Sequence, residues 1–205
     1  MNCADAALRW LLRATPNIDE AAAAIEASID AIRRASDVVR SVQRLLNHIA
    51  PDCVDVTIDV VVAQTLEMMG AETVAEGIAV VTDLQGGDAR VSGDVTLLQQ
   101  VLVNLLVNAR HALQCVEGRP RTLSVVTRTD GRSVILAVRD NGPGFAAVAQ
   151  ARAFEPFFST KRDGMGVGLA ICRSIIDAHG GEIAICSNEQ RVGAALEIKL
   201  PAIRP

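Results

Sequence analysis

The stretch Asp140–Ala170 reads D-N-G-P-G-F-A-A-V-A-Q-A-R-A-F-E-P-F-F-S-T-K-R-D-G-M-G-V-G-L-A, and it guides the interpretation of the whole chain. It holds five of the fifteen glycines and all four phenylalanines of a chain that has no tyrosine. Glycine lets the backbone approach a ligand closely, and aromatic side chains fix a loop at defined points. The stretch therefore predicts a ligand-binding loop with a few anchors.

Three glycines alternate near the end of this stretch, immediately before a helix predicted over residues 167–178. Gly164, Gly166 and Gly168 would leave backbone N–H groups free, and these groups and the helix N-terminus can hold an anion such as phosphate. A flexible loop is the alternative, because such loops are also rich in glycine. The pattern is neither a Rossmann fingerprint nor a Walker loop, which requires G-K-[ST].

At the start of the stretch, Asp140 ends an alternating strand predicted over residues 133–139. A carboxylate in this position can accept a hydrogen bond from an exocyclic amine such as that of adenine. Gly142 and Gly144 would let a flat ring approach the backbone because they have no side chains. Alone, however, D-N-G-P-G is more often a simple turn.

An apolar helix predicted over residues 94–113 contains two asparagines, Asn104 and Asn108, which are four residues apart. That spacing places both amides on one face of the helix. An amide oxygen is a hard, neutral ligand that suits a Mg²⁺ ion held otherwise by phosphates and water. The alternative is structural, with each amide bonded to neighbouring polar groups.

Two domains are expected, residues 1–50 and residues 51–205, with the boundary at Pro51-Asp52. The first is predicted to be an antiparallel helical hairpin, with a short helix over 4–14 and a long one over 18–49. The long helix has an apolar seam that the short one cannot cover, so a homodimer through the hairpin is expected. The alternative is a hairpin packed on the second domain. That domain is predicted to be α+β, a mixed and largely antiparallel sheet covered on one face by helices.

Composition excludes several classes of protein. The net charge is −4 and aromatic residues make up 2% of the chain, which argues against a nucleic-acid-binding surface. No apolar run reaches the roughly 18–20 residues of a membrane span, and no signal-like segment precedes the first helix. The five cysteines lack ligand spacing, so we expect reduced thiols packed in or near the core of a cytoplasmic protein.

Four motifs together resemble the ATP-binding domain of two-component sensor histidine kinases. They are Q-Q-V-L-V-N-L-L-V-N-A (the N box), D-N-G-P-G (first glycine box), F-E-P-F-F-S-T-K (F box) and G-M-G-V-G-L-A-I (second glycine box). These kinases belong to the GHKL superfamily with gyrase and heat-shock chaperone ATPases. The resemblance implies a Bergerat-type sandwich of helices and mixed sheet over residues 51–205.

By position, the resemblance implies that Asn108 binds Mg²⁺ and that Asp140 reads the adenine amine in a pocket shaped by Gly142 and Gly144. The second glycine box would meet the phosphates of ATP through Gly164, Met165, Gly166, Val167, Gly168 and Leu169.

The F box would form a short lid, anchored by Phe154, Phe157 and Phe158. Lys161 and His111 would lie near the phosphates. The alternatives are a solvated lysine and a histidine bonded within its own helix. His179 has a position at a helix C-terminus, where the macrodipole favours it.

The chain also departs from the kinase pattern. Residues 1–50 are similar to the later part of a kinase dimerisation hairpin, but none of His48, His111 and His179 has the H-E-x-N-Q-P-like context of a phosphoacceptor. We therefore expect a truncated kinase region without its own acceptor. Relatives usually have a threonine at Ala195 that supports the adenine-binding aspartate. One lost neutral hydrogen bond costs roughly 0.5–1.5 kcal/mol, which predicts severalfold weaker ATP binding.

The implied activity is that of a protein histidine kinase, which binds Mg-ATP and transfers the γ-phosphoryl group to a histidine. A response regulator receiver domain would be the partner of the full-length parent. A GHKL-type ATPase is one alternative, but such enzymes need a carboxylate where this chain has Asn104. A non-catalytic ATP-binding or dimerisation module is the other.

Overall fold

The computed structural model describes residues 3–13, 15, 17–29, 32, 51–160, 165–186 and 193–203. The chain divides into two compact units, Met1–His48 and Ile49–Pro205, and each is considered by itself. Within the described ranges, no helix is both long enough and apolar enough to span a membrane.

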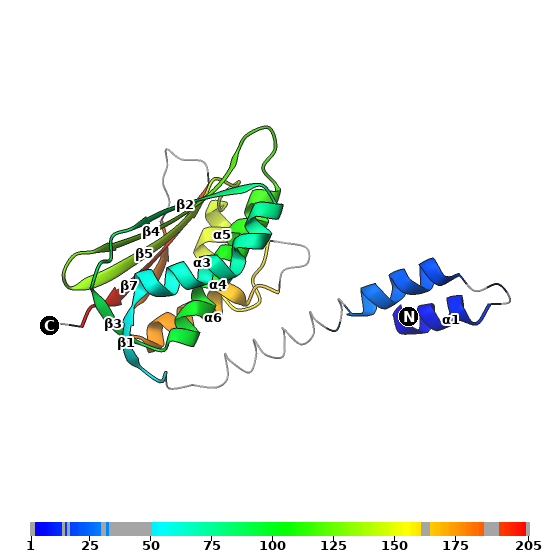
Figure 1. Cartoon of the computed structure of the whole chain (residues 1–205), viewed down its shortest axis with the longest axis horizontal. Helices are drawn as coiled ribbons and strands as arrows, with labels where there is room; N and C mark the ends of the chain where they lie inside the picture. The colour runs from blue at the N-terminus through cyan, green and yellow to red at the C-terminus, as the bar shows by residue number, and fades with distance from the viewer. Residues whose placement is uncertain are drawn as a thin grey trace. The chain divides into compact units, whose positions relative to one another are not determined.

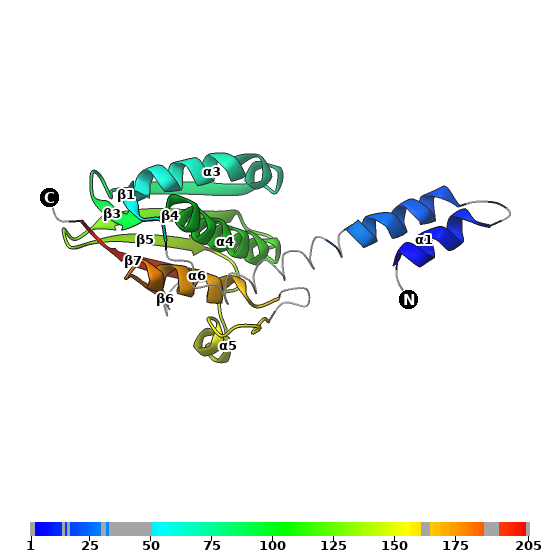
Figure 2. The same cartoon turned by 90° about the horizontal axis from the view of Figure 1, so that it is seen from below.

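The first unit contains helix α1 (Cys3–Leu11) and a second helix over residues 18–29, which lie side by side (Figures 1 and 2). Asn17 caps the second helix, because its Oδ1 accepts the N–H of Glu20 at 3.2 Å. Many of the large apolar side chains in this unit remain exposed, namely Leu8, Leu11, Leu12, Ile18, Ile25, Ile29 and Ile32. Most of the predicted apolar seam, from Ala35 to Ile49, lies outside the described residues.

The second unit is built on a five-stranded sheet with the order β2-β4-β5-β7-β6. The strands are β2 (Ile78–Leu84), β4 (Arg121–Thr129), β5 (Ser133–Asp140), β6 (Glu182–Ile185) and β7 (Ala194–Pro201). β2 is parallel to β4, and the other neighbours are antiparallel. β1 (Val54–Thr57) and β3 (Arg90–Gly93) form a separate antiparallel pair. The predicted α+β fold with a mixed sheet is confirmed.

Three helices cover one face of the sheet (Figure 2): α3 (Ile58–Ala75), α4 (Val95–Gln114) and α6 (Gly168–Ala178). The apolar side of α4 packs on the sheet and forms the centre of the core. Its fully buried side chains include Leu102, Leu105, Leu106 and Leu113. Burial of each leucine stabilises the fold by about 1.5–3 kcal/mol, so α4 is held firmly in place. A short helix, α5 (Ala147–Arg152), follows the D-N-G-P-G turn and was not predicted.

The β4–β5 hairpin forms where the sequence predicts it. Asp130 Oδ1 accepts the N–H groups of Arg132 and Ser133 at 2.9 and 2.7 Å, and Gly131 has a φ of +80° that favours glycine. This turn sets the register that places Asp140 at the end of β5, opposite Leu123.

The prediction for the cysteines is mostly wrong. Cys172 is buried, but Cys53, Cys115 and Cys186 are exposed, so only one of the thiols with described side chains is a core residue. All four are reduced.

Candidate functional site

The turn after β5, Asp140–Gly144, is packed against helix α4. Asp140 Oδ1 accepts the N–H of Gly142 at 2.8 Å, which closes the turn. A Cβ atom added to Gly142 would lie 2.7 Å from that oxygen and 3.0 Å from Ala112 Cβ of α4. Gly142 is therefore required for this close approach, and Ala112 is a site residue that the sequence analysis missed.

Gly193 is a second residue that the sequence analysis missed. Its φ is +121°, and a Cβ there would overlap the Asp140 carbonyl oxygen. Gly144 has a φ of +77° and no room for a side chain, because a Cβ atom there would lie 2.7 Å from the Gly193 carbonyl oxygen. The start of β7 thus approaches the turn backbone to backbone. An isolated glycine just before a strand was the only signal for this in the sequence.

The register between β5 and β7 corrects the expectation for Ala195. Asp140 is paired with Ala194, whereas Ala195 is paired with Arg139. Side chains of directly paired residues lie on the same face of a sheet, and successive residues alternate between faces. A hydroxyl that supports Asp140 would therefore have to come from position 194.

Asn141 and Arg119 hold the turn from its other side. The Asn141 side chain accepts the N–H of Thr122 at 2.9 Å and donates to the Pro120 carbonyl at 2.8 Å. The Arg119 guanidinium donates to the Asn141 carbonyl. These bonds clamp the segment before β4 onto the turn. Asn141 is thus a structural residue of the site, a role that the D-N-G-P-G pattern by itself does not reveal.

The glycine loop before α6 packs on the F box. Gly166 has a φ of +67°, and a Cβ there would overlap the Phe158 backbone. Gly168 begins α6, and its Cβ position lies 3.9 Å from the Asn108 side-chain nitrogen. The structure therefore brings Asn108 to the N-terminus of α6, where free backbone N–H groups and the helix dipole can hold an anion.

Helix α4 is the common wall of both ends of this site. Ala112 lies against the Asp140–Gly144 turn, and Asn108 lies beside Gly168. These two residues are one helical turn apart, about 6 Å along the axis. One rigid helix thus fixes the distance between the acidic turn and the glycine loop.

The three F-box phenylalanines do not behave alike. The Cζ atom of Arg173 lies 3.9 Å from the centroid of the Phe154 ring. The Cζ atom of Arg152 lies 4.4 Å from the centroid of the Phe158 ring. These cation–π contacts anchor two of the rings. Phe157, in contrast, is 66% exposed and has a φ of +65°, which is strained for a residue with a side chain. The prediction that Phe157 is an anchor is wrong for this structure.

The other predicted residues fall in different environments. Val167 is buried with 3% exposure, so its side chain is a core anchor, while Met165 and Leu169 are half-buried. His111 is exposed and lies one turn from Asn108. Lys161 and Gly164, both predicted to lie near the phosphates, are outside the described residues, as is His48.

Asn104 lies beside the thiol of Cys172, not at the open end of the site. Burial raises the pKa of Cys172 to about 12, and a hydrogen bond with the Asn104 side chain offsets part of this rise. The thiol also lies 3.8 Å from the Val101 carbonyl. The two asparagines on one helix face therefore differ, because Asn104 packs against α6 and Asn108 lies at its N-terminus.

His179 is at the C-terminus of α6, as predicted, and both of its ring nitrogens are engaged there. Its Nε2 accepts the N–H of Asp94 at 2.9 Å, and its Nδ1 lies 2.7 Å from the Ile175 carbonyl. Because a backbone N–H only donates, Nε2 is unprotonated and Nδ1 carries the hydrogen. The buried ring thus ties α6 to the start of α4, a contact that the position at the helix C-terminus does not by itself reveal.

Comparison with known proteins identifies the family. A sequence profile described as histidine kinase-, DNA gyrase B-, and HSP90-like ATPase matches residues 93–204, which is 112 of the 205 residues. The chain belongs to this family.

Two curated relatives of the chain are named as a sensor protein and a sensor histidine kinase. Sensor protein TdiS of Thauera aromatica is 34% identical over 176 residues, which is 85% of this chain and 32% of TdiS. Sensor histidine kinase TmoS of Ectopseudomonas mendocina is 32% identical over 187 residues, 89% of this chain and 19% of TmoS. The chain thus spans about a third or less of the length of these curated relatives.

Solved structures agree with this assignment. The catalytic domain of histidine kinase ThkA has a TM-score of 0.65 at 28% identity, covering 73% of this chain and 95% of that domain. Full-length ShkA, solved in complex with AMPPNP, has a TM-score of 0.77 at 25% identity and covers 100% of this chain and 43% of ShkA. The predicted fold and the resemblance to a histidine kinase catalytic region are confirmed.

Proposed function

We propose that this chain binds Mg-ATP in the site along α4 and transfers the γ-phosphoryl group to a histidine in two-component signal transduction. The observation that supports this most strongly is the shared wall of α4, with the acidic turn at Ala112 and the glycine loop at Asn108. An elongated ligand with a flat polar ring at one end and anionic groups at the other fits this arrangement. ShkA, a relative of the same fold, was solved with the nucleotide analogue AMPPNP.

In this proposal, the Asp140 carboxylate accepts a hydrogen bond from the adenine amine. Gly142 and Gly144 keep the turn free of side chains so that the ring can approach the backbone. Backbone N–H groups of the segment 164–169 and the N-terminus of α6 receive the phosphates. Phe154 and Phe158 hold the lid, through their contacts with Arg173 and Arg152.

Asn108 is the residue that would hold the metal ion. The described part of the chain has no cluster of three or more His, Cys, Asp or Glu side chains that could bind a metal by itself. The Asn108 side chain lies beside the N-terminus of α6, and its amide oxygen is the kind of hard ligand that Mg²⁺ accepts. Mg²⁺ is commonly held by one or two protein ligands together with phosphates and water. When bound, the ion would neutralise charge on the transferring phosphoryl group.

Further charge near the phosphates would come from His111 and Lys161. His111 is exposed and one helical turn from Asn108, so it can reach the same region. The protein supplies position and charge rather than covalent chemistry, which is what phosphoryl transfer requires.

The acceptor histidine is proposed to lie on another polypeptide or segment. His179 cannot serve, because both of its ring nitrogens are engaged in hydrogen bonds within a buried site. A response regulator receiver domain is the proposed partner downstream, and ThkA was solved in complex with such a protein. ATP and receiver domains are cytoplasmic, so we place the reaction in the cytoplasm.

A homodimer through the first unit is also part of the proposal. Leu12, Ile18 and Ile32 are 81%, 71% and 65% exposed in a helical unit of few residues. These exposed apolar side chains favour packing against the helical pair of a second copy, which would give a four-helix bundle.

An ATP hydrolase is disfavoured by the surroundings of Asn104. Its amide cannot accept a proton from water, and it packs against the buried Cys172 thiol. We expect negligible ATP turnover by the isolated chain, and rapid turnover would contradict this. A binding-only module remains the competing function, because the three histidines of the chain lack the acceptor context.

The test of phosphoryl transfer uses the full chain, γ-labelled ATP and a separate kinase fragment with an intact acceptor helix. We expect labelling of the fragment, and we expect the Asp140→Asn variant to label it far more slowly. ATP binding without any transfer to the fragment would identify a binding-only module.

A further inference from the structure

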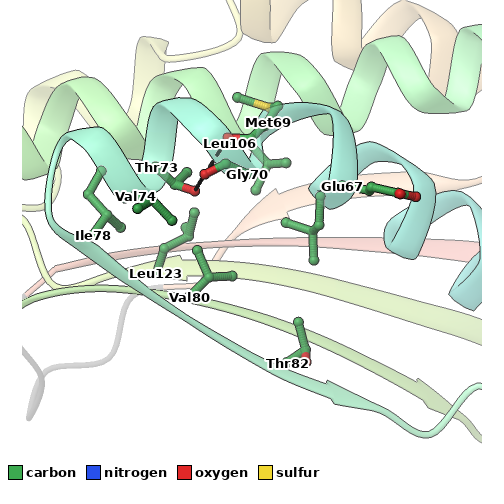
Figure 3. A pocket seen from close by; sticks show the side chains of 11 residues that line it. Glu67, Met69, Gly70, Thr73, Val74, Ile78, Val80, Thr82, Leu106 and Leu123 are labelled. Carbon is green, nitrogen blue, oxygen red and sulfur yellow. Dashed lines mark hydrogen bonds between the residues drawn. The ribbon is translucent and has the colours of Figure 1, made fainter.

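An open groove lies between helix α3 and strand β2, and the proposed function does not use it (Figure 3). Its volume is about 470 Å³, within the usual range of ligand sites of about 300–1,000 Å³. Its floor consists of Leu106 of α4 and Leu123 of β4. The helix wall is formed by Leu66, Glu67, Met69, Gly70, Thr73 and Val74.

The strand wall has a regular pattern. It consists of Ile78, Val80 and Thr82, which are alternate residues of β2 and therefore share one face of the sheet. β2 is also an edge strand, bonded to β4 on one side only. A further strand that paired with the free edge of β2 could therefore place every second side chain in the groove.

This edge is unusually apolar. Val80 and Val81 of β2 are 37% and 52% exposed, and Met68 and Val74 of α3 are 73% and 78% exposed. β2 reads I-A-V-V-T-D-L and has no proline or lysine, the residues that commonly protect an edge from pairing. Apolar side chains gathered in this way mark an interaction surface.

Charge indicates what kind of chain would pair here. Neither α3 nor β2 has a basic residue. Glu72 of α3 is neutralised by Arg110 and Asp83 of β2 by Arg128, whereas exposed Glu67 on the groove has no such partner within the described ranges. A second copy of this surface would bring another Glu67 and no cation, so the charge favours a different, basic partner.

We propose that the groove between α3 and β2 binds an extended segment of another protein by strand addition. The segment would pair with the free edge of β2 and place alternate apolar side chains between Val80 and Met69, with a Lys or Arg facing Glu67. Main-chain hydrogen bonds would supply affinity, and the groove would select the side chains.

The test uses the full chain and a fluorescein-labelled peptide of seven residues, the length of β2, which alternates Val and Thr and ends in Lys. Saturable binding in fluorescence anisotropy is expected. In two further peptides every second amide is N-methylated, in one peptide the odd-numbered amides and in the other the even-numbered ones. Each pattern removes the N–H groups along one edge of the strand. Only the peptide whose methylated edge faces β2 should fail to bind, because a strand pairs with its neighbour through one edge.

Matched variants locate the site. Val80→Lys, in the groove, should weaken binding by about tenfold or more, while Val81→Lys, on the opposite face of the same strand, should change it by less than about twofold. Glu67→Lys should weaken binding of the Lys peptide and strengthen binding of the same peptide ending in Glu. Unchanged nucleotide affinity in all three variants shows that they are folded.

Several results would overturn the proposal. They are no saturable binding of the plain peptide, equal binding of both methylated peptides, and equal effects of Val80→Lys and Val81→Lys. Sedimentation velocity is measured in parallel. The wild type could self-associate, and both Val80→Lys and the peptide could abolish this self-association. That result would assign the groove to a second copy of the chain and overturn the choice of partner.

Discussion

Asp140 and Ala194 lie directly opposite each other across strands β5 and β7. Their side chains share one face of the sheet, and Ala194 offers no polar atom to the carboxylate. The neighbouring Ala195 is paired with Arg139 and faces the other way. The structure therefore identifies position 194 as the place where a hydroxyl could support the proposed adenine contact.

Ala194→Thr is predicted to tighten ATP binding. A new neutral hydrogen bond to Asp140 is worth about 0.5–1.5 kcal/mol, which is roughly a two- to tenfold change in Kd. Ala195→Thr is the matched control and should leave the Kd unchanged, because its side chain lies on the opposite face. The Kd for ATP of both variants is measured by isothermal titration calorimetry. Tighter binding in Ala195→Thr alone would show that the argument from the β5–β7 register is wrong.

Gly166→Ala should weaken nucleotide binding by about tenfold or more. Its Cβ would overlap the Phe158 backbone, which cannot yield without moving the F box. Gly131→Ala is a suitable control, because Gly131 also has a positive φ but has open space around its Cβ position. The control should lose about 1–2 kcal/mol of unfolding free energy and keep its affinity for ATP. Equal affinities in the two variants would contradict the coupling of this loop to the F box.

Cys172 should make the protein less stable at alkaline pH. Burial raises its pKa to about 12 in the folded chain, above the ordinary value of 9.0. The raised pKa of the Cys172 thiol therefore contributes up to about 4 kcal/mol to the free energy of unfolding. This contribution is complete below pH 9 and is lost as the pH rises from 9 towards 12.

The measurement for Cys172 is the slope of the unfolding free energy against pH in that window. Cys172→Ala should flatten the slope, although it also lowers the stability at neutral pH by leaving a small cavity. Cys53→Ala, at an exposed thiol, should reproduce the slope of the wild type. An unchanged slope in Cys172→Ala would show that another group is responsible.

Local patterns account for most of what the sequence predicted correctly. The T-D-G-R turn, the alternation of β5 and the apolar side of α4 each depend on neighbours within a few residues. They were sufficient to place Asp140 at a strand end, whereas the family resemblance placed Asn108 near the phosphates that the glycine loop would meet. The family resemblance extended this to the whole sheet.

Several of the errors concern contacts between segments far apart in the chain. The partner of Asp140 depends on the register of β7, which local sequence does not set, and the structure pairs Asp140 with Ala194 instead of the expected Ala195. Gly193, Ala112 and Arg119 become site residues only when β7, α4 and the segment before β4 meet the turn. The sequence predicts the helix-end position of His179, but the hydrogen bond of its ring to Asp94 joins residues 85 apart.

The proposal that Asp140 recognises adenine is tested most directly by titration of Mg-ATP against the wild type and Asp140→Asn. A hydrogen bond to a charged group contributes about 1.5–3 kcal/mol, so the variant should bind about 10- to 150-fold more weakly. Asp130→Asn, at the other end of the same hairpin, is the matched control and should bind like the wild type. Wild-type affinity in a folded Asp140→Asn protein would contradict the proposed site.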